Sequence, residues 1–545
     1  MRPGALGGVD ALTWTIAVSP VVLLLVLVLW GRLSTPANAV VTVVVACAVA
    51  TVAFGAGPAV LAVGLGKGAW VGVWILFVIW PALLMHNLAS RIGMRELGES
   101  LENVLPRKTE NVLLLAWVLP SFLQGVSGFG TPIAVCAPLL LAIGVDATRA
   151  VALPLIGYHW AVGFGSMGSS FYMGALTAHL SAEQTHEFAA STSVLLGVNV
   201  LVSGLLVAVM YGGWRGVRDG WRVLVTVGPA MALAQLAVVH GEPAIGALCG
   251  GTAGLLAIML LRSVVSRGDR PGALARPVPV GGPGAQRIEQ ATPALRARAT
   301  AVPYIALSTV ALVVFLPPAL RAWVKSHLLL GPDFPSTATH GGRLPQATTT
   351  EALSTYNPIA LLGHPGTFLL VATAISVLVW RTGGAWRPGT WRDVRWPWLA
   401  QAWKSTPSVV LLASVAGVLV DSGMVRAMAI GAAEATGRFY PAVAPFVGAL
   451  GSFITGSTTS SNALFSALQH DVATLVGDRP ADLLAAQTAG ANVGNSLAPV
   501  VIAIGVVAVG SRTSVSAVLR MTIWPALVLL ASVLATTVVL VLVHR

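Results

Sequence analysis

Long apolar runs, separated by short clusters of charge, proline or glycine, make up most of the sequence. A membrane-crossing helix needs about 20 mostly apolar residues, because a rise of about 1.5 Å per residue must cover about 30 Å of hydrocarbon. The runs lack the short alternation of a membrane β-barrel strand, so they favour helices. They predict twelve spans near residues 11–31, 38–56, 60–89, 148–171, 191–212, 223–240, 243–262, 301–321, 358–380, 407–425, 482–510 and 521–543.

Two further apolar segments, near residues 111–145 and 441–476, are interrupted at mid-length by Gly, Ser, Thr and Pro. These segments suit re-entrant hairpins, which enter and leave the membrane on one side, better than full crossings. The predicted fold is therefore an all-α polytopic membrane protein with about twelve spans and two re-entrant helical hairpins.

Composition and charge agree with this prediction. Only 10% of the 545 residues are charged, against about 25% in soluble domains, which excludes most soluble folds. The net charge of +12 would suggest a nucleic-acid partner for a soluble chain, but here basic loops account for it and no nucleic acid is expected. The loops 262–298 and 381–404 are the most basic, so they are predicted to be cytoplasmic. Both termini of this multi-pass cell-membrane protein are then predicted to lie outside.

The two hairpin segments resemble each other. The sequence reads FLQGVSGFGTP from Phe122 and FITGSTTSSNA from Phe453, an offset of 331 residues. The first hairpin would enter from the cytoplasm and the second from outside, so the halves form an inverted-topology repeat, which is typical of secondary transporters. The alternative is a chance similarity of two Gly- and Ser-rich stretches. The predicted units are a first transport repeat (1–212), linking spans with a basic cytoplasmic loop (213–300), and a second transport repeat (301–545).

The interruptions are the candidate binding site, because broken backbone at membrane depth is tolerated only inside protein or beside a wet cavity. Each break also opens a helix, whose free N–H groups favour an anion. The alternative is that the small residues only permit close helix packing. The candidates in the first break are Ser127, Gly128, Gly130 and Thr131, and those in the second are Ser457, Thr458, Thr459, Ser460, Ser461 and Asn462.

Further polar residues lie outside the breaks. The downstream amides of Gln487, Asn492 and Asn495 are candidates to bind a substrate hydroxyl. Lys67 is expected to snorkel toward the membrane surface, and Asp421 to pair with the nearby Arg426 or with water.

Four segments carry a family resemblance: GVSGFGTPIAV, GFGSMG, PFVGALGSFITGSTTSSNALFSALQ and QTAGANVGNSLAP. Together they resemble the lactate permease family of bacterial 2-hydroxy-monocarboxylate transporters, and the resemblance extends over most of the chain. It implies proton-linked uptake of lactate or glycolate, paired re-entrant hairpins and an elevator-like movement.

The chain also departs from the family pattern. Gln124 stands where Glu is usual, Thr458 where Asp is usual, and Tyr-His-Trp-Ala at 158–161 where Asn-Thr-Ala-Pro is usual. A proton carrier must change its protonation near working pH, which Gln124 cannot do and histidine can. We therefore predict His159 as the proton-coupling group, with Gln124 marking only the position of the missing acid. The alternative is a histidine that is simply hydrogen-bonded within the bundle.

The sequence thus predicts a secondary active transporter for a small 2-hydroxy monocarboxylate, lactate or glycolate, by proton symport with alternating access. The alternatives are a carrier of another small organic anion with different coupling, a channel, and an intramembrane enzyme. No cofactor or metal is expected, since the three cysteines lie in apolar stretches without metal-binding spacing. The expected partners are the anion, a proton and the lipid bilayer, and a homodimer stays open.

Overall fold

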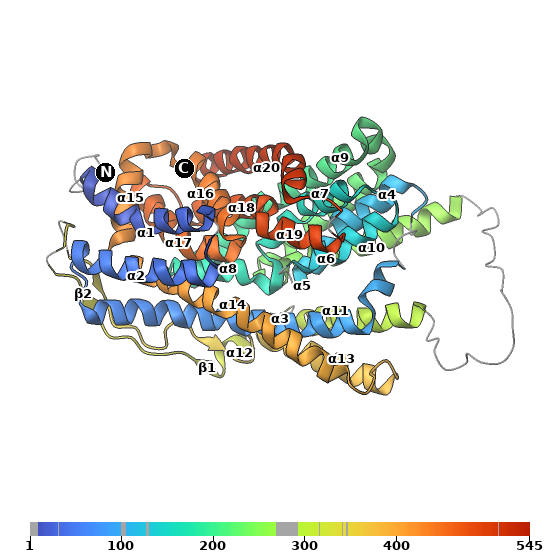
Figure 1. The fold of residues 1–545 in the computed structure, drawn as a ribbon, viewed down its shortest axis with the longest axis horizontal. Coiled ribbons are helices and arrows are strands. Elements are labelled where there is room, and N and C mark those ends of the chain that lie inside the picture. The colour runs from blue at the N-terminus through green and yellow to red at the C-terminus, as the bar shows by residue number, and fades with distance from the viewer. Residues whose placement is uncertain are drawn as a thin grey trace.

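The computed structural model describes residues 9–30, 32–99, 105–126, 130–268, 293–315, 317–340, 342–344, 347–510 and 512–545. In this part of the chain nearly all regular structure is helical, and the helices form one elongated bundle (Figure 1). Seven of the described helices are long and apolar enough to cross a bilayer alone, and a bent helix pair would make an eighth if it is one span. The polytopic helical membrane protein is therefore confirmed, while the number of twelve spans stays a prediction.

Three long helices come first: α1 (Ala11–Trp30), α2 (Thr35–Phe54) and α3 (Pro58–Glu99). The Ser34 hydroxyl caps α2 by accepting the N–H of Ala37 at 3.4 Å. Gly55 ends α2 with a φ of +66°, and a Cβ there would lie 2.0 Å from the His340 carbonyl oxygen. Only glycine fits this turn between α2 and α3.

The first broken region follows, and its pieces are α4 (Lys108–Leu113), the π-helical η1 (Leu114–Val118), α5 (Leu119–Val126), α6 (Thr131–Ala142), α7 (Ala147–Gly157), the 3₁₀ turn η2 (His159–Val162) and α8 (Gly165–Thr177). The span predicted over 148–171 is thus in three pieces. Glycines at 157, 163 and 165 disfavour a continuous helix here.

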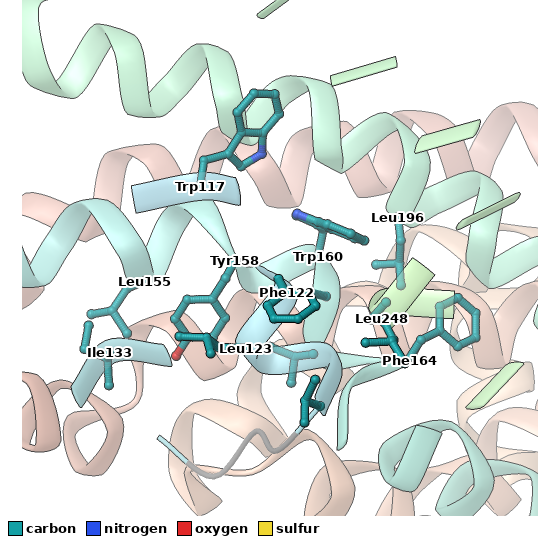
Figure 2. Packing of buried hydrophobic residues seen from close by; sticks show 14 of the residues in the cluster. Trp117, Phe122, Leu123, Ile133, Leu155, Tyr158, Trp160, Phe164, Leu196 and Leu248 are labelled. Atoms are coloured by element: carbon teal, nitrogen blue, oxygen red, sulfur yellow. The ribbon is translucent and has the colours of Figure 1, made fainter. Parts of the chain in front are cut away.

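Large buried side chains fill the space among these pieces (Figure 2). Trp117 of η1, Trp160 of η2 and Phe164 are fully buried, and Phe122 of α5 packs beside them. The broken backbone is therefore enclosed by protein, which is the condition for a break at membrane depth.

The element α9 (Ala182–Val239) is one helix in name but reverses at Gly213, where φ is +59° and ψ is −146°. Across the reversal, Gln235 Nε2 donates to the Ser193 carbonyl oxygen at 3.2 Å. A Cβ at Gly216 would lie 2.2 Å from the Ala208 carbonyl oxygen. Thus α9 is an antiparallel helical hairpin, and the spans predicted at 191–212 and 223–240 fall on its two arms, each of which begins about nine residues earlier than predicted.

The middle of the chain contains η3 (Pro243–Ile245), α10 (Gly246–Gly268), α11 (Pro293–Phe315), α12 (Pro318–Ser326), α13 (Pro365–Thr382) and α14 (Thr390–Asp421). Residues 269–292, most of the predicted linker, lie outside the described residues. Between α12 and α13, strands β1 (Leu329–Leu330) and β4 (Ile359–Ala360) pair, as do β2 (Thr337–Ala338) and β3 (Thr349–Thr350). The predicted all-α fold is thus interrupted in this one segment by two antiparallel pairs of two-residue strands, in which Thr337 and Ile359 are buried.

Helices α3 and α14 cross closely because both have small residues at the contact. A Cβ at Gly68 would lie 2.2 Å from the Ala413 carbonyl oxygen. Beside this crossing, Lys67 Nζ lies 3.0 Å from a carboxylate oxygen of Asp421, and both side chains are buried. The expectations that Lys67 snorkels and that Asp421 pairs with Arg426 or water are therefore wrong. The close approach of the helices buries both charges, and a buried charge is stable only when an opposite charge lies beside it.

The second broken region and the last helix are α15 (Met424–Thr436), the 3₁₀ turn η4 (Gly437–Phe439), α16 (Tyr440–Thr455), α17 (Thr458–Val476), α18 (Pro480–Leu497), α19 (Pro499–Ala508) and α20 (Val515–His544). The span predicted over 482–510 bends by 44° between α18 and α19. Ala498 is extended there, with ψ 124°, because a residue before proline avoids the helical region.

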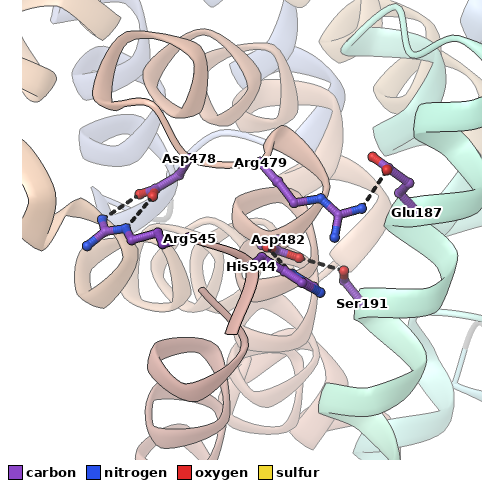
Figure 3. A network of polar contacts seen from close by, with 7 residues as sticks. All are labelled: Glu187, Ser191, Asp478, Arg479, Asp482, His544 and Arg545. Atoms are coloured by element: carbon purple, nitrogen blue, oxygen red, sulfur yellow. Dashed lines mark hydrogen bonds and ion pairs between the residues drawn. The ribbon is translucent and has the colours of Figure 1, made fainter. Parts of the chain in front are cut away.

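Ion pairs and a hydrogen bond join three elements (Figure 3). The contacts are Arg479 with Glu187, Asp482 with Ser191 and His544, and Asp478 with Arg545. The hydrogen-bonded Asp478 carboxylate raises the pKa of Arg545, because it favours the charged guanidinium. The start of α9, the start of α18 and the end of α20 thus lie together, as the predicted order of spans requires.

Candidate functional site

The second break lies between α16 and α17, at Gly456 and Ser457. Gly456 ends α16 with a φ of +70°. Ser457 is extended and caps α17, since its hydroxyl accepts the N–H of Ser460 at 3.2 Å. Glycine tolerates the first conformation and serine is a preferred N-cap. Helix α17 therefore begins here with first-turn N–H groups that have no partner within the helix.

Asn462 is the centre of a buried polar cluster next to this break. Its Nδ2 donates to the Ser170 carbonyl oxygen at 2.8 Å. Its Oδ1 accepts from Gln487 Nε2 at 2.8 Å and from Thr488 Oγ1 at 3.4 Å. Asn462 and Gln487 are both fully buried. The Asn462 amide thus joins α8, α17 and α18 in one network.

Hydroxyl groups extend this network. The Ser170 hydroxyl lies 3.0 Å from that of Thr459, and Thr177 Oγ1 donates to the Asn462 carbonyl oxygen at 3.3 Å. Ser461 Oγ donates to the Gly448 carbonyl oxygen at 3.0 Å. Sequence reasoning missed Ser170 and Thr177, although Ser170 lies two residues beyond the glycine-rich segment GFGSMG.

Two predicted site residues have polar atoms without a hydrogen-bond partner among the described residues. Thr458 Oγ1 and Asn492 Oδ1 are buried and unpaired, while Asn492 Nδ2 lies 3.4 Å from the Trp160 carbonyl oxygen. Ser460, in the same first turn of α17, is half-buried. Because a buried polar atom without a partner is costly, these atoms are the ones in the cluster best placed to accept a ligand or water.

Asn495 connects α18 to the second break. Its Nδ2 donates to the Gly456 carbonyl oxygen at 3.1 Å. A Cβ at Gly456 would lie 3.4 Å from the side chain of Val500, on α19. The second break therefore lies beside the point at which the α18–α19 pair bends.

The first break reaches the same helix. A Cβ at Gly130 would lie 2.7 Å from Ile504, one turn beyond Val500 on α19. Gly130 has a φ of +83°, and Thr131 opens α6 and is buried. The predicted site residues Ser127 and Gly128 lie outside the described residues.

Gln124, near the end of α5, packs against the start of α8. A Cβ at Gly165 would lie 2.8 Å from the Gln124 amide nitrogen. The next residues, Ser166 and Met167, have φ values of +48° and +53°. A left-handed backbone costs about 1–2 kcal/mol at a non-glycine residue. The surrounding packing therefore holds strained backbone beside the first break.

His159 lies in η2, not on a continuous helix, and its side chain is 1% exposed. Its Nδ1 lies 2.8 Å from the Ile156 carbonyl oxygen, and its Nε2 lies 3.2 Å from Asn199 Oδ1. Ser532 of α20 also donates to Asn199 Oδ1, at 3.2 Å. The His159 ring thus faces α9 and α20, whereas the Asn462 cluster lies among α8, α17 and α18.

Neither polar stretch of the second half, 457–462 or 487–495, contains an ionisable side chain. In the described residues no three His, Cys, Asp or Glu side chains are grouped to hold a metal ion. An anion at this place would be held by hydroxyls, amides and helix-terminal N–H groups.

A bundle of apolar helices with polar breaks enclosed in its interior is the architecture of an integral membrane transport protein. More specifically, the chain belongs to the L-lactate permease family, whose model matches residues 13–544. This is a family of transporters, so the protein is not an enzyme.

Two permeases of related sequence agree with this assignment. The glycolate permease GlcA of Escherichia coli (strain K12) is 26% identical over 96% of this chain and 94% of its own. The L-lactate permease of Streptococcus iniae is 28% identical over 76% of this chain and 81% of its own. The YdaH transporter of Alcanivorax borkumensis has a distantly similar structure, with a TM-score of 0.44 and 14% identity over 87% of this chain and 86% of its own.

Proposed function

We propose that this protein is a secondary active transporter for a small 2-hydroxy monocarboxylate, lactate or glycolate, and that it works by proton symport with alternating access. Relatives spanning most of the chain are named L-lactate permease and glycolate permease. A carrier of another small organic anion with different coupling is the alternative. It is kept because Gln124 and Thr458 replace acids that are usual in the family.

The polar cluster at the second break carries this proposal. The substrate carboxylate accepts hydrogen bonds from the free N–H groups at the start of α17, where the helix dipole favours negative charge. The Thr458 hydroxyl and Asn492 Oδ1 are buried and unpaired within the described residues. We assign Asn492 Oδ1 to accept the substrate 2-hydroxyl. Asn462 and Gln487 already bond to protein, so they hold the three helices in place.

Equivalent contacts in the two halves support an inverted repeat with two re-entrant hairpins. In each half, a helix before the break runs beside the helix that follows the hairpin. The contacts are Ala116 with Gly157 and Gln124 with Gly165 in the first half, and Gly448 with Gln487 and Gly456 with Asn495 in the second. The positions differ by 330 to 332 residues, close to the sequence offset of 331. We propose that residues 1–212 and 301–545 are the transport repeats and that 213–300 link them.

We further propose His159 as the proton-coupling group. Both ring nitrogens face carbonyl-type oxygens, of Ile156 and Asn199. Such oxygens only accept, so both hydrogen bonds form together when both nitrogens carry protons. Rotating the Asn199 amide would not improve the pattern, because its Nδ2 already donates to the Leu195 carbonyl oxygen at 2.9 Å.

The basic loops support an orientation in the cell membrane. The segment 381–404 contains five Arg and Lys residues against one Asp. Such loops stay on the cytoplasmic side, which places both termini outside in the proposed order of spans.

The test is uptake of labelled lactate, glycolate and pyruvate into proteoliposomes with an imposed pH gradient. We expect lactate or glycolate to accumulate when the outside is acidic, and pyruvate, which lacks the 2-hydroxyl, to accumulate less. Equal uptake of label by vesicles with and without the protein, for all three compounds, would rule out the substrate class. Uptake that does not depend on the pH gradient would rule out proton coupling but not the substrate class.

A matched pair of variants tests the site. Thr458→Val removes a hydroxyl that has no partner within the described residues, so the fold should survive while the KM for the anion rises about 5- to 10-fold, the effect of one hydrogen bond of about 1–1.5 kcal/mol. Thr537→Val is the control, since that buried hydroxyl donates within its own helix to the Val533 carbonyl oxygen at 2.8 Å and has no other partner among the described residues. Equal KM values for the two variants would remove Thr458 from the site.

A further inference from the structure

The turn of the α9 hairpin carries a cluster of arginines that the proposed transport site does not use. Arg107, Arg215 and Arg218 line a cavity of about 510 Å³ together with Asp219 and Trp221. A second cavity, of about 520 Å³, shares Arg215 and Asp219 and is also lined by Arg149 and Asp146. The two cavities together have four arginines against two aspartates, so the site carries a positive charge.

Two of these arginines have no partner within the part of the chain that the structure describes. Arg107 donates to the Asp219 carbonyl oxygen at 3.2 Å, and Arg149 lies 3.4 Å from the Asp146 carboxylate. No hydrogen bond or ion pair engages the exposed side chains of Arg215 and Arg218 within the described residues. Adjacent unpaired guanidinium groups repel each other and are suited to an oxygen-rich anion such as phosphate.

The surroundings distinguish a lipid from a soluble ligand. Trp214 is 80% exposed and Trp221 is 52% exposed on either side of the arginines. Tryptophan is enriched at the level of the lipid headgroups. Beyond them, the α9 arms continue with exposed apolar side chains such as Leu205 and Val225. A molecule with a phosphate and acyl chains can therefore contact arginine, tryptophan and the apolar face together.

We propose that the cavities around Arg215 and Arg218 bind the headgroup of an anionic phospholipid. The phosphate accepts hydrogen bonds from the two free guanidinium groups, the tryptophans lie beside the glycerol region, and the acyl chains follow the outward face of α9. This site lies at the predicted cytoplasmic end, where anionic lipids attract basic segments.

The test uses the full-length protein in detergent, with its unfolding temperature measured during titration with phosphatidylglycerol, phosphatidylcholine or inorganic phosphate. Phosphatidylglycerol is expected to raise the unfolding temperature, and phosphatidylcholine is not. For the double variant R215Q/R218Q the affinity for phosphatidylglycerol should fall about 30-fold, since each basic residue near a lipid surface contributes a factor of about five. The control R387Q/R392Q removes the same charge from two exposed positions, one just before α14 and one in its first turn, and should behave like the unmodified protein.

Each other outcome overturns the proposal. An equal rise with inorganic phosphate would identify a soluble phosphate ligand instead of a lipid. A phosphatidylglycerol effect that survives in R215Q/R218Q, or that is lost equally in R387Q/R392Q, would mean that the lipid acts through the overall charge of the protein and not through this site. No effect of phosphatidylglycerol on the unmodified protein would exclude the site.

Discussion

At His159, hydrogen bonding and burial act in opposite directions. Two carbonyl-type oxygens favour the doubly protonated ring, whereas burial among apolar side chains disfavours its charge. A group held between these influences can gain or lose a proton when its surroundings change during transport. The ring nevertheless faces α9 and α20, so its coupling to the Asn462 cluster would pass through Trp160, whose carbonyl oxygen lies near Asn492 Nδ2.

The first prediction concerns His159→Gln, which keeps a polar side chain but cannot take up a proton near neutral pH. We expect the variant to exchange lactate at the unmodified rate when the lactate concentrations inside and outside the vesicles are equal. Its uptake driven by a pH gradient should fall at least tenfold. Both rates can be measured in the same proteoliposomes. Gradient-driven uptake at the unmodified rate would show that His159 is only a structural histidine.

The second prediction concerns the Lys67–Asp421 pair. Asp421→Asn leaves the Lys67 charge buried without its counter-charge and should lower the free energy of unfolding by about 3–5 kcal/mol. The control is Asp393→Asn, which breaks an exposed pair with Arg91 and should cost about 1 kcal/mol or less. Thermal unfolding in detergent compares the two, and equal losses would mean that the Lys67–Asp421 pair is effectively solvated.

These residues also show what the sequence could not provide. Composition and periodicity place Lys67 and Asp421 on apolar segments, but their partnership joins positions 354 residues apart and depends on a close helix crossing. Ser170 and Thr177 were missed for a similar reason, since a hydroxyl on a helix is unremarkable until the helix that it faces is known. The run from Ser457 to Asn462 could be chosen as a candidate site from the sequence alone, because six polar residues in an apolar segment are expensive unless they are used.

Among the elements, hydropathy predicted the long helices, while the way in which they approach one another required the structure. The arms of α9 match their predicted spans because glycine and charge interrupt the apolar pattern between them. In the first broken region, glycines at 157, 163 and 165 indicate interruptions, but the π-helical geometry of η1 and the 3₁₀ geometry of η2 required the structure. The close approach of α16 and α18 was equally hidden, since it depends on which glycines face which backbone.

The third prediction concerns the close contact between α16 and α18. A Cβ at Gly448 would lie 1.9 Å from the Gln487 carbonyl oxygen, so Gly448→Ala must separate α16 from α18. We expect a loss of about 1–3 kcal/mol of stability and reduced uptake, because Gln487 also holds Asn462. Gly57→Ala is the control, since nothing lies within 4 Å of the added carbon. Unfolding temperatures that change equally in the two variants would contradict the tight contact.

For the whole molecule, the orientation of the bundle is the property on which the direction of transport depends. The ion pairs of Figure 3 bring three predicted outer segments together, but no contact says which side of the membrane they face. The distribution of Arg and Lys is the available argument, because basic loops are retained on the cytoplasmic side.

The fourth prediction tests this orientation with single cysteines in a chain whose Cys47, Cys136 and Cys249 are replaced by alanine. Glu351, between α12 and α13, and Arg392, near the start of α14, are both exposed and are separated by α13 alone. A membrane-impermeant maleimide added to intact cells should label Glu351→Cys, and it should label Arg392→Cys only after permeabilisation. The reverse pattern would invert the proposed topology, and labelling of both from outside would mean that α13 does not cross. Because α13 lies between a weakly charged loop and one with five basic residues, the two cysteines test the predicted difference in side directly.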